Sequence, residues 1–319
     1  MSEQITGKVT PEMFERVILR RLGAADRAAW FAVHILASDT SVSGLPLRWM
    51  AVDLNLPPET TDDDLTAIWE AFSRTCDELG LAVVTGHTAR YDGCNWPMVG
   101  GAVCAALGPE DAFVTPTMAQ VGDRIVVTKG AAIEATALFA ATFPDRLKEG
   151  VGEDVWQAAD ALFEKMTVVP EARVAARYGL RDRGVTSMHD ATEGGVLAGL
   201  TEVAAASDVG MRVELDAVPV RPEVRAVCDH VGIDPFTSIS EGTLIATVRP
   251  ERSDGFLAAL AEEGIDAAVV GEVTDPEKGT VLVVDGGDRP LEHPGLDPFW
   301  GAFGRWATEA AAASSEDDG

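Results

Sequence analysis

The 319-residue chain has few cysteines and few lysines. Its four cysteines are scattered and form no Cys-x-x-Cys pair, which argues against a disulfide framework and against a thiolate zinc site. Five lysines stand beside 20 arginines, and the formal net charge is −27. Because nucleic-acid binding requires a basic face that neutralises phosphates, we expect no nucleic-acid partner.

Long apolar runs are also absent. No stretch approaches the roughly 20 apolar residues that a membrane-spanning helix requires. The N-terminal sequence lacks the basic start and apolar core of a signal peptide. These two absences predict a cytoplasmic protein that neither spans nor contacts a membrane.

The chain is rich in acidic residues. The 52 aspartates and glutamates are spread along its whole length, and the sequence ends in SSEDDG. Repulsion among such charges weakens in molar salt, where the Debye length falls to about 3 Å. The composition therefore favours a halophilic host, and we expect the acidic end, residues 301–319, to be a solvated tail.

The length and the 46% hydrophobic content predict two domains. After a helix expected near residues 10–22, a strand pattern at 47–56 and an amphipathic helix at 62–79 indicate that strands and helices alternate. The turn-rich passage 108–123 has little periodicity and is the predicted boundary. We therefore predict an α+β fold with domains at 1–115 and 116–300.

Three predicted strands each run into a glycine-containing loop, at 83–93, 126–138 and 188–195. Glycine allows backbone N–H groups to approach a phosphate, although it also ends strands for ordinary steric reasons. Lys129 in the second loop is a positive charge suited to phosphate, and it is equally well explained as a surface lysine.

The third loop, MHDATEGG, precedes a helix that the apolar spacing places from about Gly194. In one interpretation Asp190 or Thr192 caps this helix, and Glu193 interacts with the helix dipole. In the other, the Gly194-Gly195 backbone binds phosphate and Asp190 holds Mg²⁺. The segment alone leaves both interpretations open.

Carboxylates are better candidates for metal ligands than histidines in this chain. No His-x-His or His-Glu-x-x-His spacing supports a zinc site. The hard oxygen donors Asp39, Asp190, Glu193 and Glu241 suit Mg²⁺. Asp39 and Glu241 are explained about as well as solvated or capping acids.

Four segments in chain order carry a family resemblance: TGHTARYDGCNWPMVGG, DRIVVTKGAAIEATALFA, MHDATEGGVLAGLTEVA and SEGTLIATV. They resemble the aminoimidazole ribonucleotide (AIR) synthetase-related superfamily and, within it, the archaeal relatives of hydrogenase maturation protein E. The match runs from about Val9 to Val273. The resemblance implies a two-domain AIR synthase-like fold, in which N-terminal domains pair into a dimeric β-barrel and each is flanked by an α+β C-terminal domain.

The resemblance also implies an activity. Members use ATP and Mg²⁺ to phosphorylate a poorly reactive oxygen, often an amide oxygen of a small-molecule substrate. Matched residue by residue, the metal ligands are Asp39, Asp190 and Glu241. The residues matched to nucleotide-binding positions are Gly86, His87, Thr88, Lys129, Gly130, Thr192, Gly194 and Gly195.

Three departures from the family pattern bear on function. Ala89 replaces a common glutamate, and nothing between Leu22 and Asp39 replaces the family's Asp-rich Mg²⁺-ATP loop. The chain ends in SSEDDG rather than in the cysteine that carries the carbamoyl group, so we do not expect cyano-group chemistry on its own C-terminus. Two hypotheses follow: an ATP-dependent enzyme, or a degenerate non-catalytic member that serves as a binding or dimerisation partner.

Overall fold

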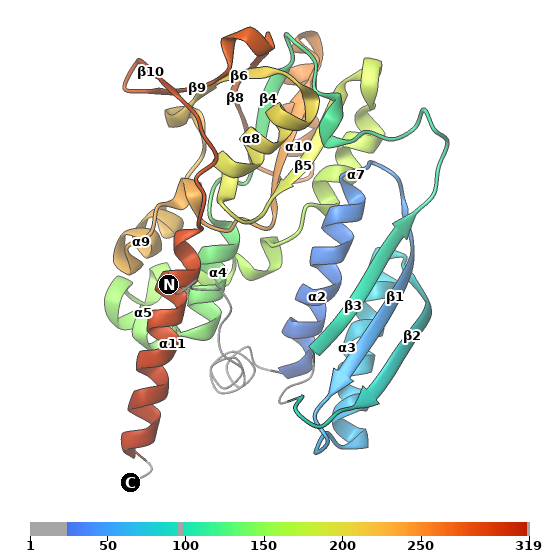
Figure 1. Cartoon of the computed structure of the whole chain (residues 1–319), viewed down its shortest axis with the longest axis vertical. Coiled ribbons are helices and arrows are strands. Elements are labelled where there is room, and N and C mark those ends of the chain that lie inside the picture. The colour runs from blue at the N-terminus through green and yellow to red at the C-terminus, as the bar shows by residue number, and fades with distance from the viewer. Residues whose placement is uncertain (1–23, 95–97, 318–319) are drawn as a thin grey trace, which may run out of the picture.

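The computed structural model describes residues 24–94 and 98–317, so the helix expected at 10–22 lies outside the described residues. Two separate β-sheets organise the chain, a three-stranded sheet in the N-terminal half and a seven-stranded sheet in the C-terminal half (Figure 1). Helices pack on both sheets. The fold is therefore α+β in two domains, as the sequence predicts.

The small sheet has the order β2-β1-β3. The central strand β1 (Leu47–Leu56) pairs in parallel with β2 (Ala82–Arg90) and antiparallel with β3 (Met98–Ala106). Side chains alternate between the two faces of a strand, so Met50, Val52 and Leu54 lie on one side of β1. Helices α2 (Ala24–Ser41) and α3 (Asp62–Leu79) share a hydrophobic core with that side.

Helix α3 begins and ends where its sequence predicts. The Thr61 hydroxyl accepts the Asp64 N–H while the Asp64 carboxylate accepts the Thr61 N–H, which forms a capping box. Gly80 ends the helix in the left-handed conformation, with φ of 76°. Local signals alone therefore define this helix.

The large sheet has the order β10-β9-β6-β8-β4-β7-β5. Its strands are β4 (Arg124–Thr128), β5 (Val185–Ala191), β6 (Gly210–Glu214), β7 (Thr243–Val248), β8 (Ala267–Thr274), β9 (Thr280–Val284) and β10 (Gly287–Pro290). β4 lies between β7 and β8 and is antiparallel to both. Helix α8 (Gly195–Ser207) packs on one face of the sheet, and α7 (Val169–Tyr178) and α10 (Ser253–Glu262) pack on the other.

A third group of helices forms its own apolar cluster beside the large sheet. Its members are α4 (Ile133–Thr142), α5 (Pro144–Val151), α6 (Glu153–Asp160), α9 (Pro222–Val231) and α11 (Pro298–Asp317). Short 3-10 turns lie at Pro116–Met118, Phe163–Lys165, Arg181–Arg183, Leu215–Ala217, Pro235–Thr237, Pro250–Arg252 and Pro276–Lys278.

The beginning of the expected acidic tail belongs to this helical group. Residues 301–310 lie within α11, and Phe303 and Trp306 are buried edge-on against Phe139. The expectation of a solvated tail from residue 301 is therefore wrong for this stretch, because its aromatic side chains recur at helical spacing and fill the core.

Within residues 24–94 and 98–317, no helix is long and apolar enough to cross a membrane.

Candidate functional site

Three loops meet at one end of the large sheet because of its antiparallel pairing. The C-terminal ends of β4 and β5 both lie beside the N-terminal end of β7. The loops at 128–133, 190–195 and 240–242 are thereby brought together. Asp39, at the end of α2, lies near the same place from the other domain, since the negative charge of Asp190 contributes to its raised pKa. We call this place the domain junction.

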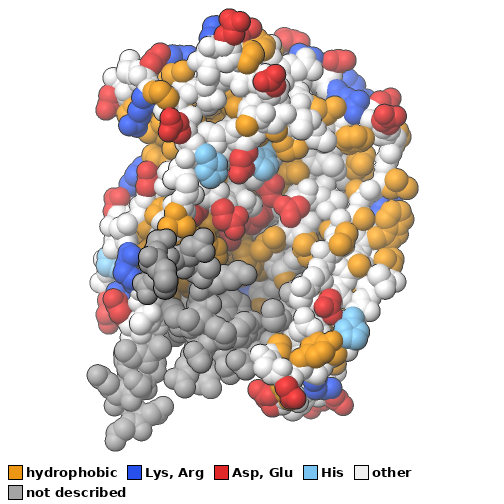
Figure 2. Space-filling view, in the orientation of Figure 1, with side chains coloured by type: hydrophobic (Ala, Val, Ile, Leu, Met, Phe, Trp, Pro, Cys, Tyr) orange, Lys and Arg blue, Asp and Glu red, His pale blue; other side chains and the backbone are white. Residues whose placement is uncertain are grey.

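The domain junction gathers carboxylates. Figure 2 shows acidic and histidine side chains close together in the middle of one face of the molecule. Partial burial and the neighbouring Asp190 carboxylate raise the pKa of Asp39 to about 6. Burial, followed by repulsion from Asp190 and Glu134, raises the pKa of Glu241 to about 9. The domain junction therefore holds carboxyl groups whose ionised form is energetically unfavourable in the free protein.

Two oxygen atoms of this cluster lack partners. Asp190 Oδ2 and Glu241 Oε1 are buried and accept no hydrogen bond, and the two residues are only 4% and 2% exposed. A buried carboxylate oxygen without a donor is costly, so both atoms suit a ligand that supplies positive charge. Among the residues that the structure describes, no three Asp, Glu, His or Cys side chains are grouped so that they could hold a metal ion.

Glu134 belongs to the domain junction, and the sequence analysis missed it. It lies in the first turn of α4, and its Oε2 accepts the Glu241 N–H at 3.0 Å. Burial raises the pKa of Glu134 to about 8. Its position immediately after the TKG loop, in the first turn of a helix, was the signal that could have identified it.

Lys129 is paired with a carboxylate of α7. Its backbone has a positive φ of 57°, and its buried Nζ lies 2.5 Å from Glu171 Oε1 on α7. The ammonium also donates to the Thr167 carbonyl at 2.6 Å. Beside it, a Cβ atom on Gly130 would lie 2.5 Å from the Pro219 carbonyl oxygen. Here the glycine accommodates protein backbone, and the lysine is committed to a structural ion pair.

The Gly194-Gly195 turn has an internal partner. Gly194 is the N-cap of α8 and provides no side-chain cap, so neither Asp190 nor Thr192 caps this helix as one interpretation proposed. The Gly194 N–H donates instead to Asp297 Oδ2 at 2.7 Å. Asp297 lies 103 residues away in sequence and was not among the predicted site residues. The backbone donor expected to bind phosphate is thus paired with a carboxylate of the same chain.

The Gly-His-Thr segment lies in a strand and not in the expected loop. Gly86, His87 and Thr88 all lie within β2, on the small sheet and away from the domain junction (Figure 1). A Cβ atom on Gly86 would lie only 2.2 Å from the Val52 carbonyl oxygen. Glycine is therefore required by the close approach of β1, and within one chain these three residues do not join the other predicted site residues.

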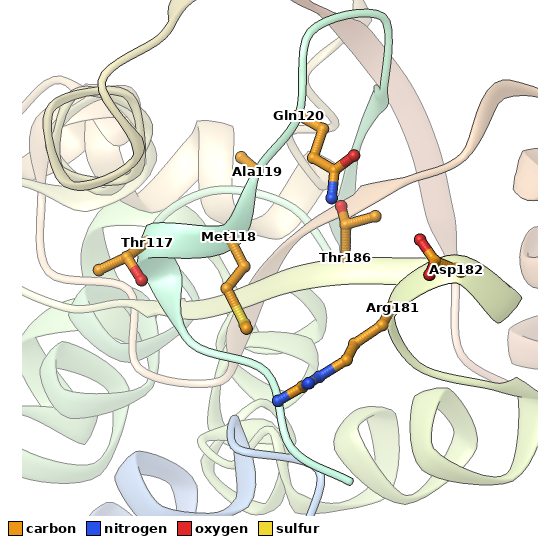
Figure 3. Close-up of a pocket in the computed structure, with 7 residues that line it drawn as sticks. All are labelled: Thr117, Met118, Ala119, Gln120, Arg181, Asp182 and Thr186. Atoms are coloured by element: carbon orange, nitrogen blue, oxygen red, sulfur yellow. The ribbon is translucent and has the colours of Figure 1, made fainter. Parts of the chain in front are cut away.

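A separate cavity of about 370 Å³ lies at the other end of β5. Gln120 points toward Thr186 across it, and Arg181 and Asp182 line its opposite side (Figure 3). The Arg181 guanidinium donates to the Phe113 and Glu110 carbonyls at 2.7 and 2.6 Å, so it tethers the segment between the domains. The cavity contains none of the predicted site residues.

Comparison with known proteins identifies both halves of the chain. The AIR synthase related protein N-terminal domain matches residues 9–108, and the C-terminal domain matches residues 120–284. Carbamoyl dehydratase HypE of Rhizobium leguminosarum bv. viciae is 26% identical over 270 residues, which cover 82% of this chain and 73% of that protein.

Solved structures agree with this match. The crystal structure of E. coli HypE, a hydrogenase maturation protein, superposes with a TM-score of 0.67 at 25% identity and covers 85% of this chain and 81% of that one. A structure of hydrogenase maturation protein HypE in complex with ATP shares the fold, with a TM-score of 0.63 at 23% identity and coverage of 85% and 81%. The chain therefore belongs to the AIR synthase related protein family, with both domains of that family in one polypeptide.

Proposed function

We propose that this protein is a HypE-like, ATP-dependent enzyme that activates an amide-type oxygen of a small substrate. One observation carries the proposal: two buried carboxylates with unpartnered oxygens, Asp190 and Glu241, lie at the domain junction beside the exposed Asp39 of the other domain. The similarity to a carbamoyl dehydratase and to a protein crystallised with ATP supports this assignment.

Asp190 and Glu241 have the donor chemistry that Mg²⁺ prefers, and a bound ion would complete its coordination with water and phosphate oxygens. Asp39, Asp190 and Glu241 are hard oxygen donors, and the unpartnered oxygens of Asp190 and Glu241 are available to a cation. A bound Mg²⁺ would supply charge neutralisation for phosphate oxygens. It would also remove the repulsion that raises the pKa values of Asp39 and Glu241.

The chain's own contribution is to hold these groups in place. Glu134 fixes the 240–242 loop by accepting the Glu241 N–H, and the Ser38 hydroxyl of α2 accepts the Val168 N–H. The Lys129–Glu171 ion pair links the end of β4 to α7. Because the carboxylate oxygens are already held in position and shielded from water, the site needs little further ordering when a charged ligand binds.

A second hypothesis is that the protein is a degenerate, non-catalytic family member. Lys129 is committed to Glu171, and the Gly194 N–H is committed to Asp297. Without a free donor at these two positions, triphosphate binding would be weak. Binding measurements distinguish the hypotheses directly.

We predict that Mg²⁺-ATP binds with a dissociation constant of about 0.1–1 mM, or roughly −4 to −5.5 kcal/mol. Asp190→Asn removes an anionic ligand and should weaken this binding about tenfold or more, while the melting temperature of the free protein does not fall, because the change also removes repulsion from Asp39 and Glu241. Isothermal titration in molar KCl measures both affinities, with the exposed Asp216→Asn as control. Affinity that is insensitive to Asp190→Asn would reject the metal-ligand role, and no affinity in the parent protein would favour the non-catalytic hypothesis.

We further propose a homodimer formed through the small sheet. The face of β1 opposite α2 and α3 carries Trp49, which is 40% exposed, and the paired strand β3 adds Val103, which is 63% exposed. An apolar sheet face of this kind is typical of a protein interface.

Light scattering should therefore give about twice the 33.7 kDa chain mass. Val103→Glu should shift the protein toward monomer, because it places a charge on the proposed interface. Val121→Glu changes a valine that is 51% exposed in the other domain and should not alter the mass. A parent protein that is monomeric at micromolar concentration would exclude the dimer.

A further inference from the structure

The segment from Leu291 to Asp297 crosses the Gly194-Gly195 turn, and we call it the strap. It links β10 to α11. A Cβ atom on Gly194 would lie 3.3 Å from Pro294 Cγ and 3.8 Å from His293 Cε1. The strap is therefore in van der Waals contact with the start of α8.

The strap ends in a carboxylate that accepts two backbone hydrogen bonds. Asp297 Oδ2 accepts the Gly194 N–H at 2.7 Å, and Oδ1 accepts the Phe299 N–H at 2.8 Å. Asp297 is only 4% exposed. A buried anion is thus bound between the N-terminal ends of α8 and α11, where the helix dipoles favour negative charge.

We propose that the strap regulates the nucleotide loop: in the free protein Asp297 Oδ2 occupies the position on the Gly194 N–H that a phosphate oxygen takes when nucleotide binds. This inference rests on the proposed function, because it assigns the Gly194 N–H to phosphate. A phosphate and the Asp297 carboxylate carry charge of the same sign and need the same donor, so the two exclude each other.

The geometry allows Asp297 to leave Gly194 without unfolding α11. The two carboxylate oxygens of Asp297 make different contacts: Oδ1 caps α11 by accepting the Phe299 N–H, and Oδ2 accepts the Gly194 N–H. Both oxygens are bonded to one Cγ atom, so release of Gly194 requires the side chain to tilt about its contact with Phe299, which the strap backbone has to accommodate. Within the strap, Gly295 has a positive φ of 80°, and the space where its Cβ would lie is open. The strap therefore has room to move at this residue.

Asp297→Asn tests the proposal with an effect opposite to that of Asp190→Asn. Asparagine still caps α11, so the fold is retained, but its neutral amide binds the Gly194 N–H less strongly than a carboxylate does. With pyrophosphate as the probe, titration calorimetry should show that Asp297→Asn binds about fivefold or more tightly than the parent protein. Glu292→Gln removes one exposed charge from the same strap and should leave pyrophosphate affinity within about twofold of the parent.

Unchanged or weaker pyrophosphate binding by Asp297→Asn overturns the proposal and makes Asp297 a fixed support of the loop. Hydrogen exchange gives a second readout: pyrophosphate should increase exchange across residues 291–297 of the parent protein, and protection of these residues would overturn the proposal. The proposed function is judged separately. Mg²⁺-ATP binding that depends on Asp190 but is not improved by Asp297→Asn would overturn only the strap, whereas no Mg²⁺-ATP binding by either protein would overturn both.

Discussion

Replacing Lys129 by methionine is expected to lower the free energy of unfolding by about 3–5 kcal/mol, because it leaves a buried carboxylate without its cation. Lys129 is 6% exposed and its partner Glu171 is 1% exposed. Methionine fills a similar volume, so the loss comes mainly from the charge and from the hydrogen bond to the Thr167 carbonyl. Urea denaturation in molar KCl measures the change.

Two further variants identify the cause of that loss. Lys129→Met combined with Glu171→Gln removes both charges and should recover about half of the lost stability or more. Lys165→Met changes a neighbouring exposed lysine and should alter stability by less than about 0.5 kcal/mol. If Lys129→Met costs under about 1 kcal/mol, the pair does not hold β4 and α7 together as described.

Glu241→Gln is expected to stabilise the free protein at alkaline pH, by on the order of 2–4 kcal/mol at pH 8. Burial and the Asp190 and Glu134 carboxylates raise the pKa of Glu241 to about 9 from an ordinary value of 4.5. The folded protein therefore holds this proton more tightly than the unfolded chain does. Its contribution to stability is complete below about pH 4.5 and is lost as the pH rises toward 9, whereas glutamine does not titrate.

Urea denaturation at pH 5 and pH 8 tests this dependence. The advantage of Glu241→Gln over the parent protein should be small at pH 5 and large at pH 8. Mg²⁺ should stabilise the parent at pH 8 more than it stabilises the variant, because only the parent keeps the carboxylate. Glu262→Gln, an exposed change on α10, is the control. An advantage that is equal at both pH values would contradict the assigned titration.

Local signals explain the elements that the sequence analysis predicted correctly. Helix α3 follows from apolar spacing, a capping threonine and a terminal glycine, all within one stretch of chain. Strand β1 follows from its apolar pattern and the prolines after it. The tail expected at 301–319 was wrong for residues 301–310, because Phe299, Phe303 and Trp306 recur at helical spacing and form a buried face of α11.

Long-range contacts explain what the sequence analysis missed. The Gly-His-Thr segment continues as a strand because it pairs with β1. The residues around position 86 in the sequence do not indicate this pairing. The partners of Lys129 and Gly194 lie 42 and 103 residues away, at Glu171 and Asp297. The sequence indicates Asp39, Asp190 and Glu241 as oxygen donors, whereas the burial of Asp190 and Glu241 and the repulsion among the three acids depend on the fold.

The position of β4 in the large sheet has a consequence for protein synthesis. β4 is the first strand of that sheet to leave the ribosome, yet its partners β7 and β8 begin only at Thr243 and Ala267. The small sheet uses strands from a single stretch, residues 47–106, and can fold while the rest is being translated. β4 must wait for more than a hundred further residues with both edges unpaired, so a ribosome that stalls before Thr243 leaves a nascent chain with an open, apolar strand for chaperones to protect.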